Sequence, residues 1–412
     1  MTLYEALGYF TEETRIMPCL SVTCGMAGEE THALRGVINE QGVPLTEDAL
    51  FDLASLTKLL TALTVLCLHE EGRLDLSAPV TRYAPEFIHL SGVTVDQVLG
   101  FEVGLVTPER VDAQPDRERG LQVLREAAPR DNGDGRAYSD MHSMVLKYVI
   151  EGAAAEGSFA VIRSRILRPL GMTETFAHVP QTLRHRCVSC DREHRIEGGK
   201  WLLREGVAPG TPHDPKARLL CRGEDVCGHA GLFATRRDMV RLCQGLLKEQ
   251  VISRKTLLGM SRNRTGRRRA DGSWTQFLGS QCYVKHPCQY HSEIPVYMSD
   301  RAIGLSGFTG HHLAVDAERG IFTLFLGSRV MNRLTVLIPE KGRSLMDYGL
   351  RPDGVGTIPW PDGSRIASSV QYVHQKDEHL HRVVMATMGL APWRSPGSEW
   401  PSGRSGFPGR QG

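Results

Sequence analysis

The sequence predicts an α/β protein in which strand-forming segments near both ends of the chain enclose a helical middle. From about Asp75 to Met172, apolar residues recur at helical spacing in segments that polar loops separate. In 303–316 and 320–330, β-branched and aromatic residues cluster between glycines, which is typical of strands. Segment 19–39 is expected to form two short strands around a glycine-containing turn. The 412 residues are expected to form one large unit with a subdomain.

The remaining elements follow from the same spacing. A helix is expected over 3–16, and another begins near Ser55 and ends where Gly72 stops the apolar pattern. Residues 393–412 are rich in Pro, Gly, Ser and Arg and are expected to be a disordered tail. The other expected helices are 94–101, 119–128, 140–155, 158–172 and 237–249.

Charge and composition argue against two classes of function. The formal net charge is +2, with 41% hydrophobic and 23% charged residues, which is ordinary for a soluble globular protein. The basic run in 262–272 is interpreted as a solvated loop, so no nucleic-acid partner is expected. No apolar run approaches the roughly 18 to 20 residues of a membrane span, so none is expected. The start of the chain lacks a basic region followed by an apolar stretch, and a cytoplasmic location is therefore expected.

The ten cysteines are interpreted as mostly reduced thiols, as is usual in the cytoplasm. Cys187 and Cys190 form a CxxC pair, but a second CxxC is missing and segment 191–206 resembles a loop more than a zinc ribbon. Structural or incidental cysteines are therefore favoured over a zinc site, and no metal is expected. The other potential ligands nearby are His185, His194, Cys221 and Cys227.

Ser55 and Lys58 stand three residues apart at the start of a helical pattern. Residues at this spacing share one face of a helix, so the two side chains can reach hydrogen-bonding distance. A serine hydroxyl becomes a good nucleophile when a base takes its proton, and a lysine that is held neutral can serve as that base. The alternative is that Ser55 caps the helix and Lys58 is a surface side chain. The spacing alone does not decide between them.

The segment around Ser55 is the first of five blocks that lie in order between about residues 45 and 330. The blocks read FDLASLTKLLTALTVLCLHEEGRLDLSAPVTRYAPEF, YSDMHSMVLKYVIEG, SFAVIRSRILRPLGMTETFAHVP, CGHAGLFATRRDMVRLCQGLL and GLSGFTGHHLAVDAERGIFTLFLGSRV. In this order they resemble the serine β-lactamase-like hydrolases, the group of class C β-lactamases, D-Ala-D-Ala carboxypeptidases and family VIII esterases. S-x-x-K is itself a signature of penicillin-recognising enzymes. The resemblance favours the catalytic interpretation of the Ser-Lys pair.

The resemblance implies a β-lactamase/transpeptidase-like sandwich. In this fold, a mainly antiparallel sheet is flanked by helices, a helical subdomain is inserted, and the active site lies between the two parts. One hydrolase domain is therefore expected over 1–345, with the helical subdomain at about 75–230. A C-terminal extension over 346–392 would follow it.

Roles carry over from the group to matching positions. Ser55 corresponds to the acylated nucleophile, Lys58 to its base or proton partner, and Tyr138 to the second acid or base. Asp140 stands where the group usually has Asn, and an acid there should raise the pKa of the lysine, so Asp140 is interpreted as a structural or substrate-orienting residue. His229 is interpreted as a packing or supporting histidine.

The third element of the group departs from its pattern in this sequence. The group carries Lys-Thr-Gly, or His-Thr-Gly in many esterase-like members, where this chain has Leu305, Ser306 and Gly307. The cation that helps to hold a substrate carboxylate is absent at Leu305, which argues against a β-lactam or D-Ala-D-Ala substrate. Ser306 and Gly307 stay candidate substrate-binding residues, and the amide of Phe308 is a candidate oxyanion donor beside that of Ser55.

The sequence therefore predicts a cytoplasmic serine hydrolase that acts through an acyl-enzyme on a small ester or amide, most simply an esterase. Its partner would be a small-molecule acyl substrate, with no cofactor or metal, and the sequence assigns no oligomeric state. Three alternatives stay open. The chain could be a non-catalytic ligand-binding homologue, an acyltransferase that uses the same acyl-enzyme, or a D-Ala-D-Ala carboxypeptidase, which would need export.

Overall fold

The computed structural model describes residues 1–26, 28–131, 133, 137–289 and 292–393. The tail predicted over 393–412 therefore lies outside the described residues, apart from Trp393. Within the described ranges, no helix combines the length and the apolar character needed to cross a membrane.

One six-stranded antiparallel sheet brings the two ends of the chain together. The first strand pairs with a strand near residue 325, in the register Val22↔Phe325, as expected from strand-forming segments near both ends. All residues of that later strand are buried, because helices cover both faces of the sheet. The strand order is β10 (Tyr283–Val284), β11 (Ile303–Ser306), β12 (His312–Asp316), β13 (Ile321–Gly327), β1 (Cys19–Met26) and β2 (Glu29–Gly36).

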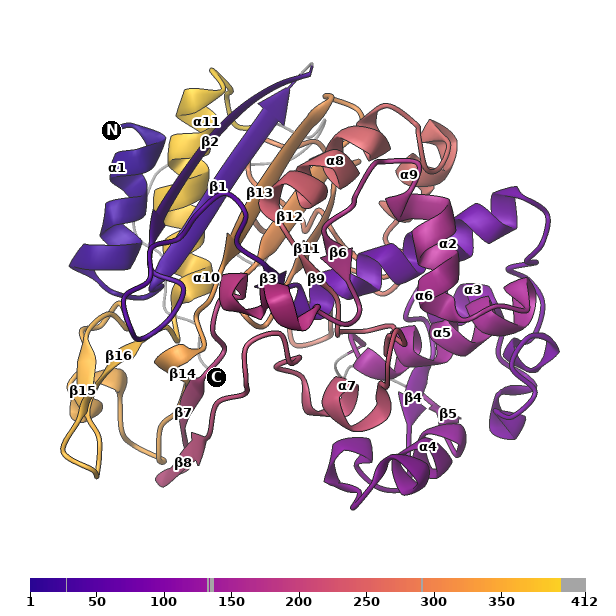
Figure 1. Cartoon of the computed structure of the whole chain (residues 1–412), viewed down its shortest axis with the longest axis horizontal. Coiled ribbons are helices and arrows are strands. Elements are labelled where there is room, and N and C mark those ends of the chain that lie inside the picture. Colours follow the sequence, from indigo (N-terminus) through magenta and orange to yellow (C-terminus); the bar gives the residue numbers. More distant parts are fainter. Residues whose placement is uncertain (27, 132, 134–136, 290–291, 394–412) are drawn as a thin grey trace.

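Two layers of helices enclose this sheet (Figure 1). The first layer consists of α1 (Leu3–Gly8), η1 (Tyr9–Glu13), α10 (Tyr372–Gln375), η10 (Lys376–His381) and α11 (Arg382–Thr387). The second consists of α2 (Thr57–Glu70), α8 (Arg236–Leu247) and α9 (Arg254–Met260). Phe10, Phe325 and Val384 share the apolar cluster under the first layer, whereas Leu63 and Leu324 belong to the main core under the second. Part of the predicted C-terminal extension thus packs on the sheet.

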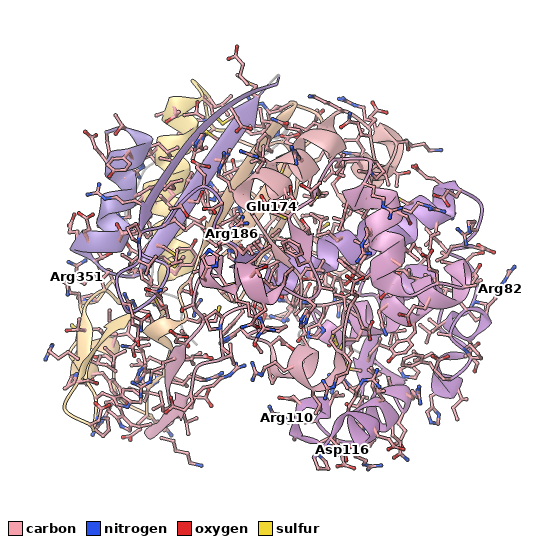
Figure 2. The ribbon with its side chains drawn as sticks, viewed as in Figure 1. Arg82, Arg110, Asp116, Glu174, Arg186 and Arg351 are labelled. Carbon is pink, nitrogen blue, oxygen red and sulfur yellow. The ribbon has the colours of Figure 1, made fainter. Side chains whose placement is uncertain are left out.

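The middle of the chain is helical, as predicted, and packs against α2 through α5 and α6. Asp116, labelled in Figure 2, begins one of these helices by accepting a hydrogen bond from the Arg119 amide at 2.9 Å. The elements are η3 (Val80–Arg82), η4 (Ile88–Leu90), α3 (Val95–Leu99), β4 (Gly104–Val106), η5 (Val111–Ala113), α4 (Arg117–Arg125), β5 (Ala128–Arg130), α5 (Asp140–Ala154), α6 (Ser158–Ile162) and η6 (Arg163–Leu167).

A second sheet corrects one expectation. Segment 191–206, interpreted from the sequence as a loop, forms a β-hairpin whose two turn residues, Gly198 and Gly199, both have positive φ. Its first strand pairs in parallel with a strand that begins at Met331, far along the chain. Ile196 is buried in an apolar cluster with Leu334 of that strand and with later residues such as Trp360. Because these partners are distant in sequence, local spacing did not show the strand. The sheet order is β15 (Thr357–Pro359), β16 (Arg365–Ser368), β14 (Met331–Ile338), β7 (Arg192–Glu197) and β8 (Lys200–Arg204), with η9 (Leu345–Tyr348) beside it.

A small three-stranded sheet fixes the chain just before Ser55. Its order is β3 (Phe51–Asp52), β9 (Phe233–Ala234) and β6 (Thr175–Phe176). Arg186, in η7 (Gln181–Arg186), donates to the Asp48 carbonyl and to Glu174, each at 2.7 Å. Figure 2 shows Arg186 and Glu174 near the middle of the molecule. These contacts hold the segment that leads into β3 and therefore the backbone that precedes Ser55.

Gly152 lets α5 lie directly on the turn that contains Tyr83. A Cβ at residue 152 would lie 1.7 Å from the Tyr83 carbonyl oxygen. Because a backbone atom cannot move aside cheaply, Gly152→Ala is expected to lower the free energy of unfolding by about 2–4 kcal/mol. Urea unfolding measures this change. Gly259→Ala in α9 is the matched control, because nothing lies within 4 Å of its added Cβ. A loss at Gly152 no larger than at Gly259 would contradict the packing of α5.

Candidate active site

Ser55 lies in a tight helical turn between β3 and α2. The chain leaves β3 at Asp52 and forms η2 (Ala54–Leu56) before α2 begins at Thr57. Ala54 has a φ of 44°, in the left-handed region, which costs a non-glycine residue on the order of 1 kcal/mol. The Asp52 carboxylate accepts a hydrogen bond from the Ala54 N–H at 2.9 Å and so stabilises the turn. Ser55 is thereby left half-buried at the start of a helix, where backbone amides favour an anion.

The Lys58 ammonium reaches Ser55 from the first turn of α2. Its Nζ donates to Ser55 Oγ at 2.9 Å and to the His229 carbonyl at 3.3 Å. Asp140 Oδ1 lies 2.8 Å from the same nitrogen. The Lys58 side chain is 0% exposed, which excludes the alternative that it is a surface side chain.

Opposing effects set the protonation of this pair. Burial lowers the pKa of Lys58, but Asp140 and Tyr138, which both interact with the ammonium, raise the pKa above its usual range. Burial raises the pKa of Asp140, but Lys58, His229 and Lys216 hold it well below its usual range. At neutral pH the pair is therefore an ammonium and a carboxylate. This agrees with the expectation that an acid at residue 140 raises the lysine pKa.

Tyr138 approaches Lys58 from the segment that leads into α5. Lys58 Nζ lies 5.1 Å from the centre of the Tyr138 ring. The same ring stacks with Phe101 and with Tyr283, in each case with 5.5 Å between ring centroids. Two residues later Asp140 begins α5, so this short segment presents both of its predicted site residues to Lys58.

The loop over residues 221–232 packs between α5 and α2 and supplies the His229 carbonyl to Lys58. Gly228, the preceding residue, has a φ of 82°, and a Cβ there would lie 2.3 Å from the Ser143 carbonyl of α5. On the other side, Thr61 Oγ1 of α2 donates to the Gly228 carbonyl at 2.7 Å. Glycine is thus required for the close approach that places His229 beside the predicted base.

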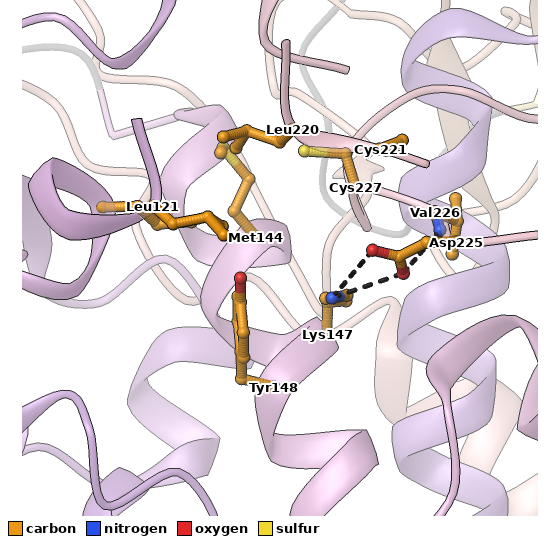
Figure 3. Close-up of a pocket in the computed structure, with 10 residues that line it drawn as sticks. Leu121, Met144, Lys147, Tyr148, Leu220, Cys221, Asp225, Val226 and Cys227 are labelled. Carbon is orange, nitrogen blue, oxygen red and sulfur yellow. Dashed lines mark hydrogen bonds and ion pairs between the residues drawn. The ribbon is translucent and has the colours of Figure 1, made fainter. Parts of the chain in front are cut away.

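The other end of this loop is anchored to α5 across a small cavity (Figure 3). Asp225 Oδ1 lies 3.3 Å from Lys147 Nζ and accepts a hydrogen bond from the Val226 amide at 2.8 Å. Cys221 and Cys227 also line this cavity, which encloses only about 10 Å³. A small-molecule site usually encloses roughly 300 Å³ or more, so this cavity is a packing feature and not a substrate site.

Strand β11 places Leu305 and Ser306 in different surroundings. The Leu305 side chain is 1% exposed and belongs to the core that contains α2. The Ser306 hydroxyl donates to Glu293 Oε2 at 2.9 Å and lies 3.1 Å from His312 Nδ1. Because successive residues of a strand point to opposite faces, these contacts direct the Ser306 hydroxyl away from Ser55. The structure therefore does not bring these two hydroxyls together.

The turn after β11 carries Gly307 to the segment that precedes Ser55. A Cβ at residue 307 would lie 3.2 Å from the Leu53 carbonyl, so glycine permits close packing on the backbone that precedes Ser55. Phe308 is 41% exposed, and its ring stacks on His213 with 5.7 Å between centroids. This position agrees with the use of the Phe308 amide as an oxyanion donor, which stays a prediction.

Asp52 joins three parts of the site, although the sequence analysis did not single it out. Its carbonyl accepts hydrogen bonds from Thr309 Oγ1 at 3.2 Å and lies 2.6 Å from His311 Nε2. Its carboxylate accepts one from the His213 amide at 2.6 Å. The turn that contains Ser55, the turn after β11 and the segment before α7 (Pro215–Leu220) are thereby fixed to one residue. Only the tertiary structure reveals this role, because the partners lie far away in sequence.

A second lysine lies on the far side of Asp140, and it too was missed in the sequence. Lys216 Nζ is 3.0 Å from Asp140 Oδ2 and 3.7 Å from Asp214 Oδ2. His229 Nε2 lies 2.9 Å from Asp214 Oδ1. Among the described residues, Asp140, Asp214 and His229 form the group of potential metal donors, with atoms within 4.8 Å of one another, and Cys187 is not part of it. The Lys216 ammonium already contacts both carboxylates of that group.

Comparisons with known proteins agree with this fold. The sequence matches the Beta-lactamase family over residues 21–333. A putative D-alanyl-D-alanine carboxypeptidase of Salmonella typhi is 25% identical over an alignment of 340 positions, which covers 76% of this chain and 76% of the other. Two solved structures are similar at 17% identity: D-amino acid amidase from Ochrobactrum anthropi SV3, with TM-score 0.61 over 94% of this chain and 99% of the other, and EstCE1, a hydrolase with promiscuous acyltransferase activity, with TM-score 0.60 over 79% and 92%.

The family match spans both the segment that contains Ser55 and Lys58 and strand β11, and it includes the helical insertion. The antiparallel sheet, its two helical layers and this insertion form the predicted β-lactamase/transpeptidase-like α/β fold. The chain therefore belongs to the beta-lactamase family of serine hydrolases.

Proposed function

We propose that the chain hydrolyses small esters or amides through an acyl-enzyme on Ser55. The observation that carries this proposal is the 2.9 Å hydrogen bond from Lys58 Nζ to Ser55 Oγ, made by a lysine that is completely buried. Burying an ammonium costs free energy unless hydrogen bonds and an opposite charge compensate for the lost hydration. Lys58 makes one of these hydrogen bonds to the half-buried Ser55. Asp140 and Tyr138 complete the pattern that the family motifs predict.

The proposed reaction has two steps, acylation of Ser55 and hydrolysis of the acyl-enzyme. Ser55 Oγ attacks the substrate carbonyl carbon, its proton passes to the Lys58 and Tyr138 relay, and the amides of Ser55 and Phe308 stabilise the oxyanion. The bond from the carbonyl to the leaving oxygen or nitrogen then breaks, and the relay proton goes to the departing alcohol or amine. Water attacks the resulting ester on Ser55, releases the acid and returns the proton to Ser55.

Two features favour a small ester or an uncharged amide over a substrate with a carboxylate beside the scissile bond. Leu305 is buried in the core and brings no cation to β11. Tyr138, whose ring lies beside Lys58, and the exposed Phe308 in the turn after β11 instead bring aromatic rings to this region. A D-Ala-D-Ala carboxypeptidase stays the alternative within the same chemistry, and acyl transfer to an alcohol or amine is the alternative to hydrolysis. A cytoplasmic location stays part of the proposal.

Intact-protein mass spectrometry tests the substrate class. The protein would be mixed with p-nitrophenyl esters of graded chain length, a p-nitroanilide, nitrocefin and a D-Ala-D-Ala peptide. We expect an acyl adduct and a burst of nitrophenol with the short esters, because they need no cation at residue 305. Ser55→Ala is the control that should show neither.

Two outcomes of this experiment would contradict parts of the proposal. An adduct with nitrocefin or the peptide at a rate equal to the esters would overturn the argument from Leu305. No adduct with any compound, together with no labelling of Ser55 by a fluorophosphonate, would favour a non-catalytic binding protein.

A further inference from the structure

This chain has Leu305 where the family usually carries a Lys or His on the strand that corresponds to β11. A second ammonium group near the proposed relay comes instead from α7. Lys216, in the first turn of α7, places Nζ 3.0 Å from Asp140 Oδ2. Lys58 Nζ lies 2.8 Å from the other oxygen, Oδ1, of the same carboxylate. Asp140 thus bridges two ammonium groups, only one of which contacts Ser55 Oγ.

Lys216 is held in this place by its own surroundings. Its side chain is 22% exposed, and Asp214 Oδ2 lies 3.7 Å from Nζ. Asp214 is fixed in turn, because Oδ1 accepts a hydrogen bond from the Ala217 amide at 2.9 Å and lies 2.9 Å from His229 Nε2. Burial lowers the pKa of Lys216, but Asp214 and Asp140 raise it, so the side chain is an ammonium. The contact with Asp140 is therefore between charged groups.

We propose that Lys216 is a positioning residue for the proton relay: by binding the second oxygen of Asp140, it weakens the hold of that carboxylate on the Lys58 ammonium, so that Lys58 releases its proton at lower pH. The proposal rests on the proposed function, because a relay exists only if Ser55 is the nucleophile. Asp140 keeps Lys58 charged, whereas Lys58 must lose its proton to act as the base. The second contact of Asp140, with Lys216, reconciles these two requirements.

The charges around the site support this direction. Asp140 lies against both ammonium groups, so removing Lys216 would leave Lys58 as the remaining lysine on that carboxylate, whereas Asp214 would keep its contact with His229. A carboxylate within about 4–6 Å of an ammonium favours its charged form. Loss of Lys216 therefore makes Lys58 harder to deprotonate. The other titratable or charged groups near the two lysines include Tyr138 before α5, His229 in the loop, and Asp112 of η5, which is paired with Arg110 at 2.6 Å. His142 of α5 also interacts with Lys58, and burial lowers the pKa of this histidine.

The test follows the rate at which a fluorophosphonate labels Ser55 as a function of pH, measured by intact mass on the full chain. In this step Ser55 Oγ displaces fluoride from phosphorus, so no knowledge of the natural substrate is required. We expect Lys216→Met to shift the pH range in which the labelling rate rises, the ascending limb, upward by about one pH unit. Labelling should then be about tenfold slower at pH values below this limb and equally fast on the plateau above it. Lys216→Gln is the second variant if the methionine chain does not fold.

Three controls isolate the role of Asp140. Lys216→Arg keeps the charge and should restore the wild-type limb. Lys255→Met removes an exposed lysine of α9 and should leave the limb in place. In an Asp140→Asn background, Lys216→Met should shift the limb by much less, because the carboxylate that couples the two lysines is gone.

The outcomes distinguish this proposal from the proposed function. No labelling of wild-type Ser55 would overturn both. Labelled wild type with an unmoved limb in Lys216→Met and Lys216→Gln, or with an equal loss of rate at every pH, would overturn the role of Lys216 and leave Ser55 as nucleophile. An equal shift with and without the Asp140 carboxylate would overturn the coupling through Asp140.

Discussion

Ser55→Ala is expected to reduce ester turnover by on the order of a thousandfold or more and to abolish the acyl adduct while the fold remains intact. The reason is chemical: Lys58 Nζ donates to Ser55 Oγ at 2.9 Å, and an alanine at residue 55 has no oxygen that could attack a carbonyl carbon. The structural cost is small, because η2 is closed by the Asp52 carboxylate on the Ala54 amide and not by the Ser55 side chain. We expect a change of at most about 2 kcal/mol in the free energy of unfolding.

Steady-state assays, intact mass and urea unfolding measure these three quantities on the same preparation. Ser91→Ala is the matched control, since Ser91 is an exposed serine outside the site, and its activity should equal that of wild type. If Ser55→Ala kept more than a few per cent of the activity, the nucleophile would have to be another residue.

Lys58→Met is expected to have the second-largest effect, a loss of about 10²–10⁴-fold in the rate of acylation, which is the usual contribution of a general base. The methionine side chain fills a similar volume in a fully buried position. Asp140 would retain Lys216 at 3.0 Å, so its carboxylate is not left unpaired, and the unfolding free energy should fall by only about 1–3 kcal/mol.

The contacts of Lys58 also predict the direction in which the wild-type rate changes with pH. Asp140 and Tyr138 raise the pKa of Lys58 against the opposing effect of burial, so the resting side chain is charged and donates to Ser55 Oγ. A charged lysine cannot accept the serine proton, and acylation should therefore accelerate as pH rises through neutrality into the alkaline range. Lys58→Met should lose this ascending limb, whereas the exposed control Lys255→Met should keep it. A limb that survives in Lys58→Met would assign the base to another group.

Much of the site could be predicted because it is local in sequence. Ser55 and Lys58 lie three residues apart on one helical turn, and Tyr138 and Asp140 flank the start of a single helix, so spacing and motif order identify them without a fold. The opening helix, the first two strands and the helical middle were predicted for the same reason, since each follows from the periodicity of its own residues.

Other features depend on residues that are distant in sequence. The hairpin over 191–206 was missed because it pairs with β14 and shares an apolar cluster with residues more than 100 positions later in the chain. Ser306 shares a motif with Gly307, but strand alternation points its hydroxyl toward Glu293. No local pattern marks Asp52 as the point where three segments meet.

The sequence by itself determined the fold class, the family and the pair that carries the proposed chemistry, because these are written in short-range spacing and in the order of blocks. Only the tertiary structure decided the electrostatics of that pair. It buried Lys58, gave one oxygen of Asp140 to it and the other to Lys216 from α7, and left Leu305 in the core. The physical reason is that burial and the distance between charges set a pKa, and both quantities exist only once segments far apart in the chain have packed together.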